Sequence, residues 1–292
     1  MKVLVILVTY NAMRWIDKCL TSLLKSSILV DCIVIDNKSS DNTVETIKRN
    51  YSFCKIIESK ENLGFGKANN IGLQYAIDND YDFVYLLNQD AWIFPDTLSV
   101  LIKAYQSHRE YGILSPLQMN ASCSKLDKNF QICCPKNLTS DSICGCLKDV
   151  YPTSFVMAAH WLIPKDILLK IGGFSPSFPH YGEDHNYVQR MTYKHFKIGI
   201  VPAAKAVHDR EFRKDSKSLI MRKEYLHTIV EISNPNNKLY KNLFIQPFWL
   251  FKRCVKLKSL TGLKYIYVLL INYPKFIRNR KLSLQFAFLK KE

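Results

Sequence analysis

The feature that most constrains the fold is a regular alternation of apolar runs and helical patterns in the first hundred residues. Four short runs read as strands, namely "KVLVILV", "CIVID", "CKIIE" and "FVYLLN". Between and after them lie segments with the apolar spacing of amphipathic helices, such as Ile16, Leu20, Leu23 and Leu24. Strands that alternate with helices of this length indicate βαβ units and an α/β fold with a mostly parallel central sheet.

Polar residues follow three of these strands directly. They are Thr9-Tyr10-Asn11, Asp36-Asn37 and Asn88-Gln89-Asp90. In an open parallel sheet, ligands bind outside the carboxyl ends of the strands. We therefore expect these side chains to line one cleft.

The charge of the chain divides it into two parts. The net charge is +16 over 292 residues, and residues 241–292 contain 12 Lys and Arg against one acid, which gives +11 and leaves +5 for the rest. A hydrophobic content of 48% excludes wholesale disorder. Helical patterns dominate from about Ser216, so we predict a catalytic domain over 1–215 and a helical, basic C-terminal extension over 216–292.

The extension suits an anionic membrane surface or a nucleic acid. Its aromatic residues fit base stacking as well as the lipid headgroup region, but the aliphatic run "YIYVLLI" favours the membrane. Simple packing on the main domain is the alternative. No run reaches the 18 or so apolar residues of a spanning helix, and "VLVILV" is too short for a signal peptide. We expect a cytoplasmic protein, peripheral on the inner face of the membrane, with no nucleic acid partner.

Nine cysteines occur at mostly irregular spacings, five of them as C-x9-CC-x9-C-x-C between Cys123 and Cys146. Paired C-x-x-C spacing is absent, which disfavours a zinc site. Reduced thiols in a cytosol fit this usage best. The pattern predicts no role for the Cys-rich segment 119–150.

Several acids are candidates for chemistry. Asp36 and Asp90 each end a strand, and Glu183-Asp184 begins a helix after the loop "GGFSPSFPHYG". Each could equally be a capping residue, but together at one edge they indicate a site for a divalent cation and a nucleotide. "ENLGFGKANN" is neither a dinucleotide fingerprint nor a Walker sequence. Its Lys67 could meet a diphosphate.

Six segments, in this order, resemble family 2 glycosyltransferases of the GT-A fold, closest to their rhamnosyltransferase-like branch. The segments are "VTYN", "VIDNKSSD", "ENLGFGKANNIGL", "LLNQD", "GGFSPSFPHYGED" and "VHD". The resemblance covers about residues 3 to 230. It implies a hexosyl- or deoxyhexosyltransferase that builds a bacterial surface polysaccharide or another glycan.

The resemblance also implies roles for individual residues. Asp184 matches the catalytic base, beside Glu183, which would orient the acceptor or cap the helix. Asp90 would hold Mg²⁺ or Mn²⁺ on the donor diphosphate, and His208 matches a histidine that completes the metal shell in some members. The residues implied in binding the nucleotide-sugar, a dTDP- or UDP-sugar, are Thr9, Tyr10, Asn11, Asp36, Lys67, Asn70, Asn88 and Gln89.

The sequence departs from the family pattern at the metal and acceptor motifs. Asn88 stands where the family's DxD motif has its first acid, which implies fewer charged ligands for the metal. Ser175 follows "GGF" where the family often has Asp, and the ED motif continues with His185-Asn186 in place of a repeated acid. These changes concern acceptor contacts more than the base.

The implied reaction is a single inverting displacement, because no second carboxylate is placed as a nucleophile. Asp184 would take the proton of an acceptor hydroxyl, and the acceptor would be a glycan, free or lipid-linked. Two alternatives stay open. One is a metal-dependent nucleotidyltransferase, although "TYNAMRW" lacks the Gly- and Lys/Arg-rich loop expected after its first strand. The other is a non-catalytic protein that binds nucleotide-sugars or polyanions.

Overall fold

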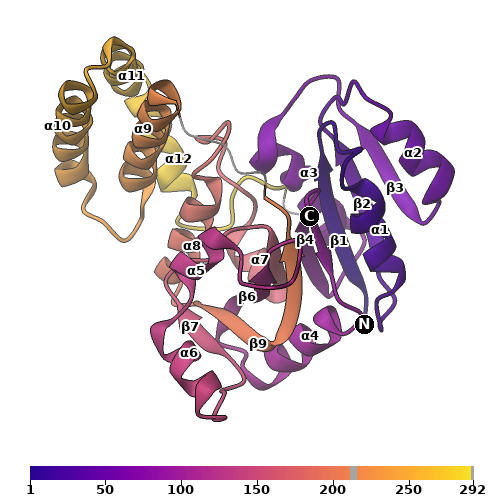
Figure 1. Cartoon of the computed structure of the whole chain (residues 1–292). Coiled ribbons are helices and arrows are strands. Elements are labelled where there is room, and N and C mark those ends of the chain that lie inside the picture. The colour runs from indigo at the N-terminus through magenta and orange to yellow at the C-terminus, as the bar shows by residue number, and fades with distance from the viewer. Residues whose placement is uncertain (211–215, 291–292) are drawn as a thin grey trace.

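A nine-stranded sheet with helices on both faces organises the first two thirds of the chain (Figure 1). The computed structural model describes residues 1–210 and 216–290. The strands are β1 (Val3–Thr9), β2 (Asp31–Asp36), β3 (Cys54–Glu58), β4 (Phe83–Asn88), β5 (Ala91–Ile93), β6 (Tyr111–Met119), β7 (Tyr151–Thr153), β8 (His160–Pro164) and β9 (Lys197–His208).

Helices connect these strands and then form the C-terminal extension. The first eight are α1 (Ile16–Leu24), α2 (Thr43–Asn50), α3 (Gly64–Asp78), α4 (Thr97–Ser107), α5 (Lys128–Cys133), α6 (Lys136–Ile143), α7 (Lys165–Ile171) and α8 (Glu183–Tyr193). The extension contains α9 (Lys217–Ser233), α10 (Leu239–Leu257), α11 (Leu260–Ile271) and α12 (Tyr273–Leu282). The predicted domain boundary falls at residue 215, which lies outside the described residues.

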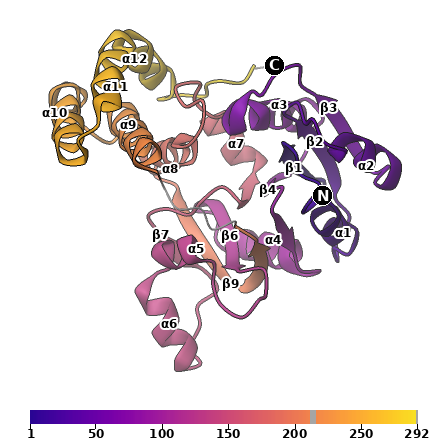
Figure 2. The same ribbon diagram turned by 45° about the horizontal axis from the view of Figure 1, so that its top comes forward.

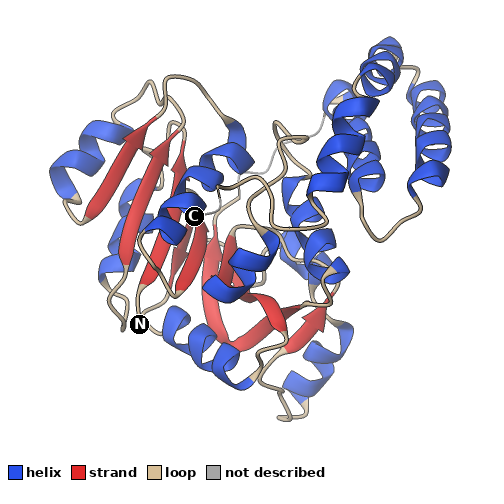
Figure 3. Ribbon diagram, turned by 180° about the vertical axis from the view of Figure 1, so that it is seen from behind, coloured by secondary structure: helices blue, strands red, loops and turns tan. Residues whose placement is uncertain are grey.

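The sheet has a parallel half and a mixed half, in the order β3-β2-β1-β4-β8-β6-β9-β5 (Figure 3). The strands predicted from the first hundred residues form the parallel half, β3-β2-β1-β4. In the other half β8 runs antiparallel to both β4 and β6, whereas β6 and β9 are parallel. The α/β fold with a central sheet and a helical C-terminal region is thus confirmed.

The pattern "KIGIVPAAKAVH" predicts two short strands, which is wrong, because β9 is one strand of 12 residues. Its register against β6 shifts between the pairs Pro116↔Val201 and Leu117↔Lys205. Pro202, which cannot donate to the ladder, falls in that irregularity. The strand therefore continues past the proline and carries His208 to its carboxyl end.

Alternate residues of the central strands pack into two cores, one on each face of the sheet. Val5 and Leu7 of β1 pack with residues of α1 and α4, while Leu4 and Ile6 pack with residues of α3 and α7. This alternation is the strand period of two, applied to a sheet that is covered on both faces. The cores fix the strand ends, and with them the polar residues that follow.

The extension has its own small core and stands to one side of the sheet (Figure 1). The core contains Phe178, from the loop before α8, together with residues of all four C-terminal helices. After α12 the chain returns to the main domain (Figure 2). There Gly173 N–H donates to the Ala287 carbonyl at 2.8 Å, and Lys290 N–H donates to the Gln74 side chain of α3 at 2.7 Å.

In residues 1–210 and 216–290, no helix combines the length and the apolar character that crossing a bilayer requires.

Candidate active site

The loops after β1 and β2 are tied together by Asp36. Its carboxylate accepts hydrogen bonds from the Thr9 hydroxyl at 2.8 Å and from the Ser39 amide and hydroxyl at 2.8 and 2.6 Å. Both Thr9 and Asp36 are buried. The structure therefore brings these two predicted residues together in the interior, at the carboxyl ends of β1 and β2, where they position the two loops.

Tyr10 and Asn11 are exposed, and the Asn11 amide donates to the Ser39 hydroxyl of this network at 2.9 Å. The Gln89 side chain accepts from the Tyr10 amide at 2.7 Å and donates to the Tyr10 carbonyl at 3.2 Å, which joins the ends of β1 and β4. Asn11 has a left-handed backbone (φ 52°), and its side-chain oxygen accepts from the Ser40 amide at 2.8 Å. Asn11 is one of the residue types that tolerate this conformation.

The two predicted residues of α3 have different surroundings. Lys67 is exposed on the first turn of the helix. Asn70 is half-buried, and its amide donates to the Phe174 carbonyl at 2.9 Å and accepts from the Phe174 amide at 2.6 Å. Asn70 therefore braces the loop that leads to α8, a contact between residues 104 positions apart that the sequence pattern did not indicate.

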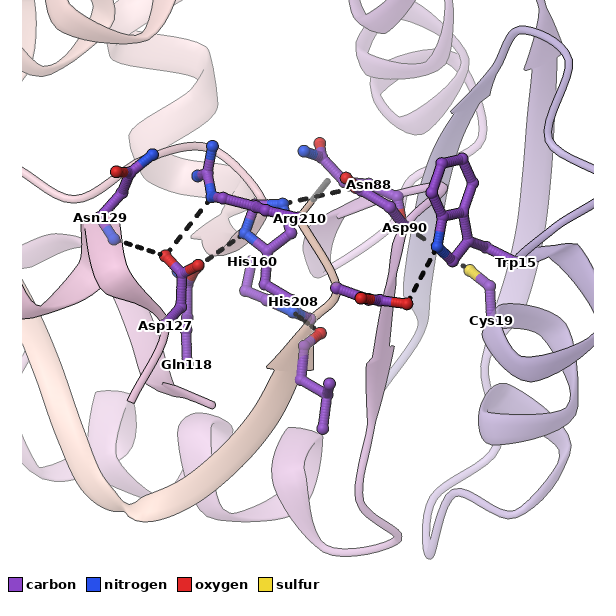
Figure 4. Close-up of polar contacts among 12 residues, drawn as sticks. Trp15, Cys19, Asn88, Asp90, Gln118, Asp127, Asn129, His160, His208 and Arg210 are labelled. Carbon is purple, nitrogen blue, oxygen red and sulfur yellow. Dashed lines mark hydrogen bonds and ion pairs between the residues drawn. The ribbon is translucent and has the colours of Figure 1, made fainter. Parts of the chain in front are cut away.

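Asp90 and His208 meet at the carboxyl edge of the sheet, where the β5–β9 register pairs Ala91 with His208 (Figure 4). The Asp90 Oδ1 atom lies 3.4 Å from His208 Nε2. Burial raises the pKa of the Asp90 carboxyl, but the hydrogen bond and charge of His208 outweigh burial and hold that pKa below its ordinary value. An ionised carboxylate and an imidazole therefore face each other here.

The other side of the His208 ring determines which nitrogen faces Asp90. His208 Nδ1 lies 3.4 Å from the Gln118 oxygen, and the Gln118 amide donates to the Ser115 hydroxyl at 3.2 Å. The Gln118 contact at Nδ1 therefore directs Nε2 toward Asp90, and outer contacts of this kind orient metal-binding histidines.

The donor set suits a hard divalent cation with few protein ligands. Asp90 and His208 supply two donors, and the buried Oδ1 of Asn88 has no hydrogen-bond partner among residues 1–210 and 216–290. Among the described residues, no three His, Cys, Asp or Glu side chains cluster as a complete metal site. Mg²⁺ commonly takes one or two carboxylates and completes its shell with substrate phosphates and water. The residues present fit a cation that binds together with a diphosphate.

Three residues near Asp90 and His208 were not predicted as site residues from the sequence. His160 lies behind His208 and is fully buried, and burial together with the His208 charge lowers its pKa to about 3, so it stays neutral. Asp209 accepts from the Trp15 indole at 3.1 Å, and Arg210 lies 3.4 Å from Asp127 (Figure 4). The charged run Asp209-Arg210 directly after His208, at the end of a strand, could have indicated two of these three residues.

Glu183 and Asp184 begin α8, and they differ in environment. Glu183 is 6% exposed, and its Oε2 has no hydrogen-bond partner in the described part of the chain. Burial and the Asp184 charge raise the pKa of Glu183 to about 8. Asp184 is half-buried, and its Oδ1 accepts from the His185 amide at 2.8 Å. At neutral pH Glu183 therefore keeps its proton, and Asp184 is the residue of the two that is open to a ligand.

A hollow of about 440 Å³ lies close to the start of α8, lined by residues 132–136 and 152–155. The Phe155 ring on its wall stacks on His185 with centroids 3.8 Å apart. Burial and the Asp184 charge raise the pKa of Cys133, another wall residue, to about 11. The Cys-rich segment thus forms part of the surroundings of Asp184.

Comparison with known proteins identifies this arrangement of a mixed sheet with polar loops at its carboxyl edge. Residues 4–131 match the family model described as glycosyl transferase family 2. The chain has the GT-A fold, and its resemblance to family 2 glycosyltransferases is confirmed over residues 4–131. The rhamnosyltransferase-like branch stays a prediction.

One curated relative and two solved structures illustrate the similarity. The low-salt glycan biosynthesis hexosyltransferase Agl10 of Haloferax volcanii is 24% identical over 190 residues, which cover 62% of this chain and 60% of that protein. The chain thus spans about three fifths of the length of this relative.

Two crystal structures share the fold at low sequence identity. S. aureus TarS 1–349 in complex with UDP-GlcNAc has a TM-score of 0.55 at 18% identity, covering 96% of this chain and 79% of that one. The mannosyltransferase PcManGT of Pyrobaculum calidifontis, in complex with GDP-Man and Mn²⁺, has a TM-score of 0.61 at 16% identity, covering 97% and 84%.

Proposed function

We propose that this chain transfers a hexosyl or deoxyhexosyl group from a nucleotide-diphospho-sugar to an acceptor hydroxyl during assembly of a surface polysaccharide or related glycan. The main support for this proposal is the contact between Asp90 and His208. The contact lies at the carboxyl edge of the sheet, where strands β1 and β2 also end. A hexosyltransferase among the relatives and the nucleotide-sugars bound in the similar structures support it.

The donor would lie across the carboxyl ends of the parallel strands. The exposed residues Tyr10 and Asn11 would contact its nucleoside, on loops that Thr9 and Asp36 hold in place. Asp36 itself is proposed to lie on the side of the uracil or thymine base. Lys67 would meet the diphosphate, while Asn70 and Gln89 position the surrounding backbone. These residues favour a dTDP- or UDP-sugar.

Asp90 and His208, with the Asn88 oxygen, would hold Mg²⁺ or Mn²⁺ against the diphosphate. Such a cation supplies charge neutralisation for the leaving nucleoside diphosphate. Similar structures were crystallised with Mn²⁺. The rest of the chemistry belongs to this chain's own side chains.

Asp184 would accept the proton of the acceptor hydroxyl while that oxygen attacks the anomeric carbon and the bond to the diphosphate breaks. Glu183 is protonated at neutral pH and buried, so it serves as a neutral support beside the base. A single displacement by one base inverts the anomeric configuration. The hollow beside Phe155 is the proposed place for the acceptor glycan.

If the acceptor is a lipid-linked glycan, the enzyme works at a membrane surface. The basic extension, with +11 over residues 241–292, would bring the cleft to the anionic inner face of the cytoplasmic membrane. The protein would then be a cytoplasmic, peripheral membrane enzyme.

A thermal-stability screen tests the donor site. We would measure the melting temperature with Mn²⁺ and dTDP-rhamnose, UDP-galactose, UDP-GlcNAc or GDP-mannose, because a ligand held by the native state raises it. At least one nucleotide-sugar should stabilise the wild type, and Asp90→Asn should lose the Mn²⁺-dependent part. Equal stabilisation of Asp90→Asn would contradict the assignment of Asp90.

A further inference from the structure

Helix α10 presents an unusual apolar stripe to solvent. Its members recur at helical spacing along one side of the helix and are between 49% and 80% exposed; they are Tyr240, Phe244, Phe248, Phe251 and Val255. Isolated exposed apolar residues are ordinary on protein surfaces, but a continuous aromatic row marks an interaction surface.

This stripe is not the face on which α10 packs. Leu250 and Cys254 are buried in the core of the extension, and Gly262 of α11 lies against Cys254. Helix α11 repeats the arrangement with an exposed row of its own, made of Leu260, Leu263, Tyr267 and Ile271, between 49% and 84% exposed. Each helix thus has one apolar face that packs in the core of the extension and a second apolar face that is exposed to solvent. We call residues 239–271 the hairpin.

Cations border the stripe of α10. Lys241, Lys252 and Lys256 follow one another at helical spacing on the adjacent side of the helix. The Lys252 ammonium lies 4.7 Å from the centre of the Phe248 ring and 5.0 Å from that of Trp249. An aromatic row beside a row of lysines is the pattern of helices that lie in the headgroup layer of anionic lipids.

We propose that the hairpin is a membrane-docking surface for a bilayer that contains anionic phospholipid. The aromatic stripe enters the boundary between headgroups and acyl chains, and the lysines contact lipid phosphates. The exposed row of α11 is mostly aliphatic, which favours lipid over nucleic acid. Binding of a nucleic acid uses aromatic stacking and phosphate contacts, and aliphatic side chains supply neither.

The extension that carries the hairpin packs on the loop that precedes Asp184. Asn279 of α12 donates to the Ser177 hydroxyl at 2.8 Å, and Phe178 is part of the extension core, which also includes Leu250 of the hairpin. Docking would therefore hold this loop near the bilayer. This last step rests on the proposed function, whereas lipid binding by the hairpin does not.

The full-length protein with three exposed aromatic residues replaced, Phe244→Ser, Phe248→Ser and Phe251→Ser, tests the proposal by vesicle co-sedimentation. The control variant replaces three leucines of similar exposure on other elements, Leu24→Ser, Leu29→Ser and Leu169→Ser, which are 60%, 92% and 43% exposed. A charge variant replaces Lys241, Lys252 and Lys256 with Gln. Vesicles contain phosphatidylcholine with or without about one third phosphatidylglycerol.

We expect the wild type and the control to bind the anionic vesicles, and the aromatic and charge variants to bind at least about tenfold more weakly. Binding should also weaken without phosphatidylglycerol and at high salt. Undiminished vesicle binding by the aromatic variant would overturn the proposal. The proposal would also be overturned if the protein binds no vesicles but binds single-stranded RNA, and the aromatic variant loses that RNA binding. A dimer in solution that the aromatic variant abolishes would overturn it as well.

The Mn²⁺-dependent stabilisation by a nucleotide-sugar separates this inference from the proposed function. If the aromatic variant keeps that stabilisation but loses vesicle binding, both proposals are supported. If neither the wild type nor any variant binds vesicles while the donor still stabilises the protein, the membrane inference and the proposed membrane location both fail, and the proposed sugar transfer stands. Vesicle binding without any donor effect would overturn the proposed function alone.

Discussion

At the scale of single residues, Glu183 is the most perturbed acid at the proposed active site. Its folded pKa of about 8 lies above the ordinary 4.5, because burial and the Asp184 charge penalise the ionised form. The folded state thus keeps a proton that the unfolded state releases, so this residue's stabilising contribution is complete below pH 4.5 and is lost as the pH rises to about 8.

Replacing Glu183 with Gln should remove this pH dependence. Over that window, the free energy of unfolding of the wild type should fall relative to Glu183→Gln by up to about 1.4 kcal/mol per pH unit. Urea unfolding of both proteins at several pH values measures the difference. Parallel stability curves would mean that the carboxyl ionises normally in the folded protein.

Asn88 offers a second test at this scale. Its buried side-chain oxygen has no hydrogen-bond partner among the residues that the structure describes, and Asn88 takes the place of the first acid of the family's DxD motif. Asn88→Asp adds a charged oxygen ligand, so the Mn²⁺ concentration that gives half of the donor-dependent stabilisation should fall several-fold. Without metal the variant should be less stable by about 1–3 kcal/mol, because a second carboxylate is buried near Asp90. An unchanged Mn²⁺ requirement would show that residue 88 does not face the cation.

At the scale of elements, the return of the chain after α12 depends on a glycine. Gly172 closes α7 with φ 82°, and a Cβ there would lie 2.1 Å from the Ala287 carbonyl oxygen. Gly145 provides a matched control, since its φ is 68° and a Cβ there would meet no atom of the described residues within 4 Å.

We expect Gly172→Ala to destabilise the protein by at least about 3 kcal/mol, from backbone strain and displacement of the C-terminal segment. Gly145→Ala should cost only about 1 kcal/mol from its left-handed backbone. Denaturant unfolding of the two variants measures both values. Similar losses at the two positions would argue against a close contact between Gly172 and Ala287.

The parallel half of the sheet could be predicted because each of its strands is a local pattern, an apolar run with a helix after it. The other half could not, since β8 and β9 reach their places through pairings with strands far away in the sequence. For the same reason Asp90 and His208 could be proposed as partners only through the family resemblance. Their contact depends on the β5–β9 register.

At the scale of the whole molecule, the C-terminal extension has its own core but packs on the sheet-containing part of the chain through Phe178 and Ala287. The sequence indicated its helices and its charge, but not that Phe178 would lie in its core or that Ala287 would reach Gly173. These contacts join surfaces whose complementarity no local pattern reveals. They also make surface substitutions, rather than removal of residues 241–292, the appropriate test of membrane docking.

We propose that Asp184 removes the proton of the acceptor hydroxyl while the donor is bound at the carboxyl edge of the sheet. Sugar transfer by the wild type and by Asp184→Asn, measured with Mn²⁺ and the donor found in the stability screen, tests this role. We predict that the variant keeps donor binding and loses transfer by about 10²- to 10⁴-fold, the usual contribution of a general base. Transfer at the wild-type rate by Asp184→Asn would contradict the account.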